Sequence, residues 1–403
     1  MSNIQILMLL SLLSLVVTMV AYPHVLRYAR HFNVVDNPDA RKLHRQPVPV
    51  MGGVAVYIGI LAGCMVMSTF VRGASFNWSI MSFTTMLVLG VWDDMKSLSA
   101  ILRLLVQFGI VGFYIGFTGH YIGNFYGLFG IYELSPWVGI PLSLIAGVGT
   151  INAINMIDGV DGYSSGYGMM ACTSFAVIFT MTGRMVWAAL AAIVASALIP
   201  FFMHNVFGKR SKMFIGDGGT MMLGFMMVIF EFGVLSYGHG SKLESRGIGP
   251  IALVLAILCI PIFDTMRVMI ARIVRGYSPF KPDKSHLHHL FIDMGFSHLG
   301  AAISILLLNM TVMLTWFLLW QFGASVNMQF CIVALMGFTV TFALYKLMRW
   351  QQFSGPVGAD GMPQGGALWH KACRLGRWSH REDKVFWLKI QMLVDNRWLR
   401  LRK

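Results

Sequence analysis

The sequence predicts an all-α protein that crosses a membrane many times. Of its 403 residues, 56% are hydrophobic and 12% are charged, and the mean hydropathy is +0.67. A soluble domain carries about 25% charged residues, roughly twice this fraction. Apolar runs of about 17–25 residues, the length that crosses a bilayer as a helix, recur along the whole chain. Together these observations exclude an ordinary soluble protein.

The apolar runs predict eleven transmembrane helices. The first run lacks the basic start and the small-residue cleavage site of a secretory signal peptide, so we expect it to remain as a span. The run at 77–92 is the shortest of the set. The predicted spans are 4–22, 52–71, 77–92, 101–118, 136–157, 163–182, 186–203, 219–237, 248–271, 299–320 and 326–347.

The basic residues gather on one side of this predicted bundle. Of the 31 Lys and Arg residues, only four fall with the other set of loops: Arg72, Arg184, Lys242 and Arg246. Loops rich in Lys and Arg remain in the cytoplasm, so we expect a periplasmic amino terminus and a cytoplasmic carboxyl terminus. The net charge of +14 then reflects topology and attraction to anionic lipid, and we expect no nucleic-acid partner.

A dense polar motif lies at the end of the fifth predicted span and in the loop that follows it. It contains Asn152, Asn155, Asp158 and Asp161, with a glycine after each aspartate. An Asp at the bilayer centre costs about 2.5–3.5 kcal/mol on insertion scales, so we expect the motif at the membrane face. Its oxygens could bind a hard cation, a sugar or a base. The alternative is a polar loop that turns at Asp-Gly and only connects two helices.

Two further acidic motifs lie on the same side. Asp93-Asp94 ends the third span, and Asp217, between glycines, begins the eighth. Adjacent carboxylates repel each other and both stay ionised only near a cation, and Mg²⁺ prefers oxygen ligands. Glycine amides at a helix start can also bind phosphate. A solvated helix end or a simple N-cap explains each motif alone, but their shared face favours one cytoplasmic site that holds a metal.

The cytoplasmic loop after the ninth span is basic and rich in histidine, with Arg272, His286, His288 and His289. Cationic side chains of this kind bind diphosphates. Zinc or haem ligation is the alternative for the histidines, although no cysteine accompanies them. A second basic segment, with Lys42 and His44, precedes the second span. An anchor that only sets topology is the alternative there.

In their order along the chain, these motifs resemble those of the polyprenyl-phosphate N-acetylhexosamine-1-phosphate transferases. The resemblance covers roughly residues 1–348 and also includes Arg103 and Gln107 after the Asp93-Asp94 pair. The histidine loop is most similar to the branch that transfers GlcNAc-1-phosphate to undecaprenyl phosphate. Relatives that transfer phospho-MurNAc-pentapeptide usually have three consecutive histidines there. Tyr163 and Thr220 stand where leucine and serine are common, and neither changes the expected chemistry.

The resemblance implies an enzyme that moves GlcNAc-1-phosphate from UDP-GlcNAc to undecaprenyl phosphate and releases UMP. Such a reaction initiates lipopolysaccharide O-antigen or enterobacterial common antigen synthesis. The resemblance also implies Mg²⁺, or Mn²⁺, as cofactor, and a bacterial inner membrane with the site facing the cytoplasm. The family is often dimeric, which leaves a homodimer open. Another UDP-N-acetylhexosamine remains open as the donor.

The resemblance further assigns roles to individual residues. Asp93 and Asp94 are expected to be catalytic, near the metal and the acceptor phosphate, and Asp217 to be a metal ligand. The acceptor phosphate has a second pKa near 6 and needs little deprotonation, which favours direct attack. Prior attack by a carboxylate remains the alternative. The residues expected to bind substrate are Asn155, Asp158, Asp161, Arg272, His286, His288, His289, Lys42 and His44.

Three further expectations concern the lipid acceptor and the peripheral segments. An apolar groove near the fifth and ninth spans should receive the lipid. The external segment 119–135, rich in glycine and aromatic residues, should form a small hairpin. Residues 349–403 form a separate basic tail after the catalytic domain of 1–348. Its tryptophans among basic residues favour an amphipathic segment on the anionic inner leaflet, with a solvated tail as the alternative.

A transporter or channel is the main alternative from another functional class. A transporter would place its charges near mid-membrane at helix breaks, whereas most charges here fall at cytoplasmic helix ends. A non-catalytic scaffold or receptor gives no reason for three acidic motifs on one face. The sequence therefore favours the transferase.

Overall fold

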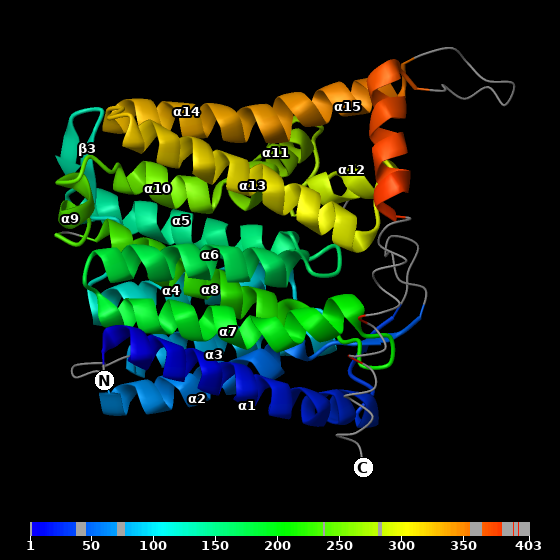
Figure 1. Cartoon of the computed structure of the whole chain (residues 1–403), viewed down its shortest axis with the longest axis horizontal. Coiled ribbons are helices and arrows are strands. Elements are labelled where there is room, and N and C mark those ends of the chain that lie inside the picture. The colour runs from blue at the N-terminus through cyan, green and yellow to red at the C-terminus, as the bar shows by residue number, and fades with distance from the viewer. Residues whose placement is uncertain are drawn as a thin grey trace, which may run out of the picture.

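The computed structural model describes residues 2–37, 46–70, 77–236, 238–280, 284–354 and 365–380, together with Ile390 and Val394. The main helices form one bundle, in which most of the long ones run side by side (Figure 1). They are α1 (Asn3–His31), α2 (Gly52–Phe70), α3 (Asn77–Lys96), α4 (Ala100–Thr118), α5 (Pro136–Met156), α6 (Tyr163–Met181), α7 (Met185–Phe207), α8 (Gly216–Leu235), α10 (Pro250–Ile257), α11 (Cys259–Val274), α13 (His298–Gln321) and α14 (Val326–Phe338), which continues through η1 (Thr339–Leu344) into α15 (Tyr345–Gln352).

The all-α, multi-pass fold is confirmed. Among the described residues, eight helices are long and apolar enough to cross a membrane, and the bent pair α10–α11 makes a ninth. The predicted spans 77–92 and 163–182 coincide with α3 and α6, helices of 20 and 19 residues. The total of eleven spans and the orientation of the termini stay predictions.

The short elements lie at the two ends of the bundle. Helix α12 (Leu287–Asp293) lies at one end, and α9 (Ser241–Glu244) at the other with the hairpin of β3 (Asn124–Leu128) and β4 (Ile131–Glu133) (Figure 1). The predicted hairpin is therefore confirmed, and its external position stays a prediction. Its turn places Phe129 and Gly130 at φ of 52° and 77°. Two consecutive positive φ values suit a tight hairpin turn, and glycine adopts the second without strain.

Helix α8 is the core of the bundle. Every residue of its apolar window is buried inside the protein. Glycines allow its neighbours to approach to backbone contact: a Cβ at Gly90 of α3 would lie 2.4 Å from the Asp217 carbonyl, and one at Gly53 of α2 would lie 2.2 Å from the Cα of Gly219. Small residues permit such close helix packing within membranes. The contacts lie at the amino-terminal end of α8, where Asp217 stands.

The ninth predicted span, 248–271, is not one straight helix. It divides into α10 and α11, which meet at an angle of 75°. Pro261 explains the break, because it lacks an N–H group and its ring would clash with the carbonyl of Ile257 four residues earlier. That carbonyl instead accepts hydrogen bonds from the Tyr167 hydroxyl (3.0 Å) and from Asn309 Nδ2 (3.1 Å). The Asn309 Oδ1 accepts from the N–H of Ile260 at 3.0 Å, which satisfies the other side of the bend.

A short parallel contact connects the segment before α2 to the start of α8. Strand β1 (Val35–Asp36) pairs antiparallel with β2 (Val48–Pro49), and Val50 then bridges to Phe214. The amides of Gly52 and Gly53 donate to the carbonyls of Phe214 and Ile215, both at 2.8 Å. The sequence did not predict this contact. It fixes the position of the segment that leads into Asp217 at the start of α8.

The close approach at Gly90 yields a stability prediction. Gly90→Ala should lower the thermal midpoint, because the added methyl group meets backbone atoms of α8 and overpacking typically costs about 1–3 kcal/mol. Gly109→Ala on α4 is the matched control, since no atom lies within 4 Å of its Cβ position. Thermal unfolding of purified protein in detergent measures both variants. Equal midpoints for Gly90→Ala and the wild type would contradict the packing described.

Candidate active site

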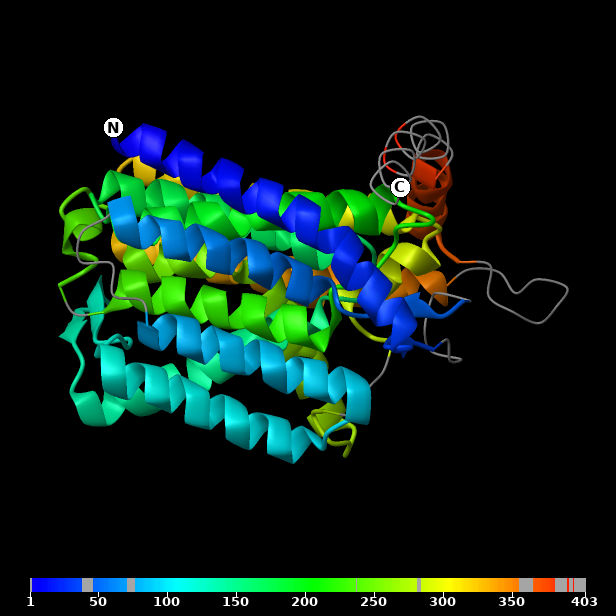
Figure 2. The same cartoon turned by 90° about the horizontal axis from the view of Figure 1, so that it is seen from below.

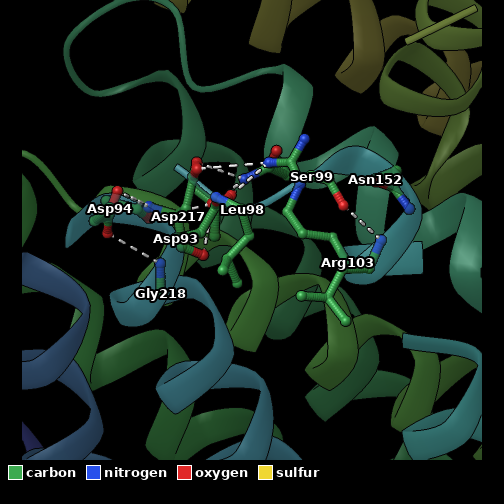
Figure 3. Close-up of polar contacts among 12 residues, drawn as sticks. Asp93, Asp94, Leu98, Ser99, Arg103, Asn152, Asp217 and Gly218 are labelled. Atoms are coloured by element: carbon green, nitrogen blue, oxygen red, sulfur yellow. Dashed lines mark hydrogen bonds and ion pairs between the residues drawn. The ribbon is translucent and has the colours of Figure 1, made fainter. Parts of the chain in front are cut away.

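The carboxylates of Asp93, Asp94 and Asp217 come together where α3 ends and α8 begins (Figure 3). The Asp94 carboxylate accepts hydrogen bonds from the amides of Asp217 (3.1 Å) and Gly218 (3.4 Å). A carboxylate is stabilised there because the first amides of a helix lack partners and carry partial positive charge. Gly216 has φ +75°, and a Cβ on it would lie 2.5 Å from Asp94 Oδ2. Glycine at 216 is thus required for this contact.

Arg103 of α4 lies between two of these carboxylates. Its Nη1 is 2.6 Å from Asp93 Oδ2 and 3.8 Å from Asp217 Oδ2. The other oxygen of Asp93 accepts from the amide of Leu98 at 2.6 Å (Figure 3). Asp93 is therefore held on both oxygens and is buried, whereas 38% of the Asp217 side chain is exposed. Asp217 is the carboxylate of this pair that a ligand can reach.

Asn155, at the end of α5, joins this group. Its Nδ2 donates to Asp217 Oδ1 at 2.9 Å and to the Thr220 hydroxyl at 2.8 Å. This contact requires only a hydroxyl group at position 220. Threonine and serine both supply one, so Thr220 can replace the usual serine. One turn earlier, Asn152 donates to the buried Gln107 at 2.7 Å. The motif at the end of the fifth span thus contacts the start of α8 directly, as the sequence predicted.

Asp158 and Asp161 lie in the loop between α5 and α6 and differ in environment. Asp158 is exposed and accepts a hydrogen bond from Ser164 at 2.6 Å.

Asp161 is paired with Lys212 and His298. Its Oδ2 lies 2.6 Å from Lys212 Nζ and 3.0 Å from His298 Nδ1. Burial alone would raise the pKa of Asp161, but the His298 hydrogen bond and the Lys212 charge bring it below the ordinary value. Asp161 is only 9% exposed and fastens the loop to α13 and to the segment before α8. This geometry favours a role in holding Asp158 rather than in touching a ligand itself.

The histidine loop is anchored on α11. His286 Nδ1 lies 3.0 Å from Asp264 Oδ2, and Arg267 lies 2.6 Å from the other oxygen of Asp264. His288, on α12, contacts the Asp158 loop, because a Cβ on Gly159 would lie 1.9 Å from its Nε2. The structure therefore brings the histidine loop to the aspartate motif, although more than 100 residues separate them in the chain.

The charge of this loop differs from the sequence expectation. Burial lowers the pKa of His288 well below its usual value and that of His289 to about 4, and the neighbouring histidines contribute. Both imidazoles are then neutral at pH 7 and can donate or accept one hydrogen bond each. The positive charge comes from arginine and lysine. Arg272 is buried and donates to the carbonyl of Pro279 at 2.6 Å, so it also orders the loop.

Two of the expected substrate-binding residues, Lys42 and His44, lie outside the described residues. Sequence reasoning missed Lys212, His298 and Asp264 as members of the site. In the sequence, Lys212 is one of many basic residues on the predicted cytoplasmic side. His298 lies after the histidine loop and belongs to no recognisable motif. An acidic residue inside an apolar span was the only signal for Asp264.

The oxygen atoms at the start of α8 suit a hard cation. In the part of the chain that is described, no three His, Cys, Asp or Glu side chains form a complete metal cage. Mg²⁺ does not need one, because it usually takes one or two carboxylates together with substrate phosphates and water. Asp94 and Asp217 supply such carboxylates, and the absence of thiolate in the group disfavours a zinc site. The residues present therefore fit Mg²⁺.

Comparison with known proteins agrees with this site. Residues 76–234, which include all three carboxylates, match the model of Glycosyl transferase family 4. The chain is 32% identical over 300 residues to a probable undecaprenyl-phosphate N-acetylglucosaminyl 1-phosphate transferase of Bacillus subtilis (strain 168), covering 74% of this chain and 80% of the relative.

Two other relatives extend the comparison. The undecaprenyl-phosphate alpha-N-acetylglucosaminyl 1-phosphate transferase of Escherichia coli (strain K12) is 30% identical over 285 residues, 70% of this chain and 75% of that protein. The decaprenyl-phosphate N-acetylglucosaminephosphotransferase of Mycolicibacterium smegmatis (strain ATCC 700084 / mc(2)155) is 28% identical over 378 residues, 87% and 90% of the two chains. The resemblance seen in the motifs is thereby confirmed, and the chain belongs to glycosyl transferase family 4.

Proposed function

We propose that this protein transfers GlcNAc-1-phosphate from UDP-GlcNAc to undecaprenyl phosphate and releases UMP. The observation that carries the proposal is the meeting of carboxylates from α3 and α8 with Arg103 and Asn155, beside a loop that carries Asp158 and contacts His288. The names of the relatives supply the acceptor lipid and the sugar. Two phosphates must meet in this reaction, and a site that combines carboxylates with cationic and neutral donors is suited to that task.

The reaction is a displacement at phosphorus. An oxygen of the lipid phosphate forms a bond to the phosphorus that carries the sugar, while the bond from that phosphorus to the bridging oxygen breaks. UMP leaves with the electron pair of that bond. The lipid phosphate is mostly dianionic at pH 7, because its second pKa is near 6, so the attack needs no general base.

A bound Mg²⁺ would be held by Asp217, with Asp94 and Asp93 nearby. When bound, it would neutralise charge on the phosphates and polarise the reacting phosphorus. Asn155 orients Asp217 through its 2.9 Å hydrogen bond, and Arg103 balances the charge of Asp93. Mn²⁺ offers the same oxygen coordination and is the alternative ion.

The donor nucleotide and sugar would lie between the Asp158 loop and the histidine loop. Asp158 is exposed and can accept hydrogen bonds from a sugar or base. The neutral imidazoles of His288 and His289 offer directional hydrogen bonds, and the arginine and lysine side chains of the loop attract the diphosphate. GlcNAc is the sugar that the relatives' names support, and other UDP-N-acetylhexosamines are the alternative donors.

Direct attack is favoured over a phosphoryl-aspartate intermediate. Both oxygens of Asp93 accept short hydrogen bonds, from Arg103 and Leu98, and Asp94 faces the amides of α8. A carboxylate held in this way is stabilised as an anion and is a weaker nucleophile. The aspartate pair then positions the metal and the acceptor. A sugar-phosphate-labelled protein trapped in the absence of acceptor lipid would overturn this choice.

The acceptor lipid would approach from the side of the bundle. Its phosphate stays at the headgroup level, so the carboxylates at the helix ends must be open to lipid as well as to cytosol. Helix α11 exposes an apolar stripe of Met266, Ile270 and Ile273, and α5, against which α11 packs, exposes Ile145. We propose that the lipid chain lies along this surface of α5 and α11.

This function implies a place in the cell. The protein would lie in a bacterial inner membrane with its site facing the cytoplasm, where UDP-sugars are made, and would initiate O-antigen or common-antigen type glycans. A homodimer would fit the family pattern. A transporter is the alternative of another class, and the grouping of Asp93, Asp94 and Asp217 at helix ends argues against it.

The first prediction about activity concerns the three carboxylates. Alanine at Asp93, Asp94 or Asp217 should reduce transfer by about 10²–10³-fold or more, as loss of transition-state electrostatic stabilisation does. Incorporation of radiolabel from UDP-GlcNAc into undecaprenyl diphosphate lipid, with release of UMP, measures the effect. Glu133→Gln in the exposed external hairpin is the control and should keep wild-type activity. Full activity in the Asp217 variant, with folded protein, would remove the proposed site.

The second prediction concerns the cofactor. Chelation with EDTA should abolish transfer, and Mg²⁺ or Mn²⁺ should restore it, because carboxylates and phosphates together select hard divalent ions. Transfer measured across a series of metal concentrations checks this. Undiminished activity in excess chelator would contradict the metal assignment.

The third prediction concerns the hydrogen bonds around Asp217. Asn155→Ala should raise the Mg²⁺ concentration needed for half-maximal activity by about 10–100-fold, the usual effect of losing an outer-shell partner. Thr220→Ser keeps the hydroxyl that Asn155 contacts and should remain close to wild type, whereas Thr220→Val should shift the requirement in the same direction as Asn155→Ala. An unchanged metal requirement in Asn155→Ala would show that Asn155 does not orient Asp217.

A further inference from the structure

The segment after α15 forms a helix over residues 367–380 that does not belong to the bundle. It runs across the ends of the bundle helices, at a steep angle to them (Figure 1), and a second view places it at one edge of that end (Figure 2). One face packs on the protein, with Trp369 only 9% exposed. The opposite face is open, with Leu375 and Trp378 55% and 59% exposed. The family match at 76–234 does not include this helix.

The packed face lies directly against the end of α12. A Cβ on Gly376 would lie 2.4 Å from the Met294 carbonyl oxygen and 3.0 Å from the Phe296 amide. The backbone of the 367–380 helix therefore touches the backbone of the turn that joins α12 to α13. Ser379 makes a similar contact, since a Cβ on Gly300 would lie 2.6 Å from its hydroxyl. Only glycine at 376 allows this approach.

Helix α12 is also held by a contact with α15. Arg349 Nη1 lies 2.6 Å from Asp293 Oδ2, the last residue of α12. The neighbouring Tyr345 ring lies under the guanidinium of Arg267, 3.8 Å from ring centroid to Cζ. Arg267 is the residue that pairs with Asp264, which in turn holds His286. Two series of contacts thus lead from α15 to the histidine loop, in addition to the contact that Gly376 of the tail makes with Met294.

The far side of α12 faces the aspartate motif. Helix α12 has seven residues, too few to be stable without tertiary contacts. The His288 ring packs directly against the backbone of Gly159, next to Asp158. Leu287 and Leu290 anchor α12 in the core of the bundle. The Asp158 loop on one side, and α15 with the tail on the other, then fix the position of α12 further. A shift at Met294 or Asp293 would be transmitted to His288 through less than two helical turns.

We propose that α15 and the 367–380 helix together act as a brace that sets the distance between the histidine loop and Asp158, and so shapes the donor site. The inference rests on the proposed function and adds to it a positioning role for Gly376, Trp369 and Arg349. None of the three touches a carboxylate of the Asp93 group among the contacts described here. Their effect should therefore fall on the UDP-sugar and spare the lipid acceptor.

Kinetics with both substrates separate this role from a general structural one. Gly376→Val should push the 367–380 helix away from Met294 and raise the KM for UDP-GlcNAc by about tenfold, since displacements near 1 Å cost up to about 10²-fold in a positioned site. The KM for undecaprenyl phosphate should stay within about twofold of wild type. Leu375→Ala, on the open face of the same helix, is the matched control and should leave both constants unchanged.

A second pair of variants tests the brace without a bulky insertion. Arg349→Met removes the ion pair with Asp293, and Arg349→Lys retains a cation there. The methionine variant should raise the donor KM a few-fold, and the lysine variant should recover most of the loss. If Gly376→Val does not give folded protein by size-exclusion chromatography, the two Arg349 variants still test the brace. An unchanged donor KM in Arg349→Met would then contradict it.

Direct binding distinguishes failure of the brace from failure of the proposed function. Calorimetric titration of UDP-GlcNAc into the full-length protein with Mg²⁺, without lipid acceptor, should show binding by wild type and weaker binding by Gly376→Val and Arg349→Met. Wild-type protein that neither binds nor consumes UDP-GlcNAc would overturn the proposed donor. Wild-type binding with unchanged affinity in both variants, or equal losses for donor and acceptor, would overturn the brace.

Discussion

The site depends on the contact between the Asp94 carboxylate and the first amides of α8. A buried helix leaves these amides without partners, and an anion at that position satisfies them. The contact requires α3 and α8 to approach closely, which Gly90 and Gly218 allow. Once it forms, Asp93 and Asp217 lie within reach of the same Arg103 guanidinium. The close packing of α3 on α8 therefore also brings the three carboxylates together.

Several features were predictable because they depend on local sequence. The length of the apolar runs predicted the helices, and the glycine and aromatic content of 119–135 predicted the hairpin. The polar motifs at the ends of the spans indicated the site residues Asp93, Asp94, Asn155 and Asp217. The bend at Pro261 was not predicted, because an apolar run reads as one span whether or not the helix breaks. Its stability depends on Asn309 and Tyr167, which lie far away in the chain. Pairings such as that of Asp161 with Lys212 likewise arise only from tertiary structure.

The histidine loop shows how burial changes the meaning of a motif. In sequence, three histidines beside arginine and lysine indicate a cationic surface. In the structure, His288 and His289 are neutral because burial disfavours their charged forms. They contribute hydrogen-bond geometry, while the fixed charges of arginine and lysine contribute attraction. Neutral imidazoles also pack against Gly159 at lower desolvation cost than imidazolium ions would.

The two halves of the site are built differently, and the substrates explain why. A lipid phosphate reaches only the headgroup level, so the groups that meet it must be fixed at that depth. Asp93, Asp94 and Asp217 satisfy this because they terminate helices packed along their whole length. A nucleotide sugar arrives from the cytosol and can be met by loops, provided that those loops are ordered. Helix α12 is too short to be stable alone, and the contacts with Gly376 and Arg349 add to the packing of Leu287 and Leu290 in the core.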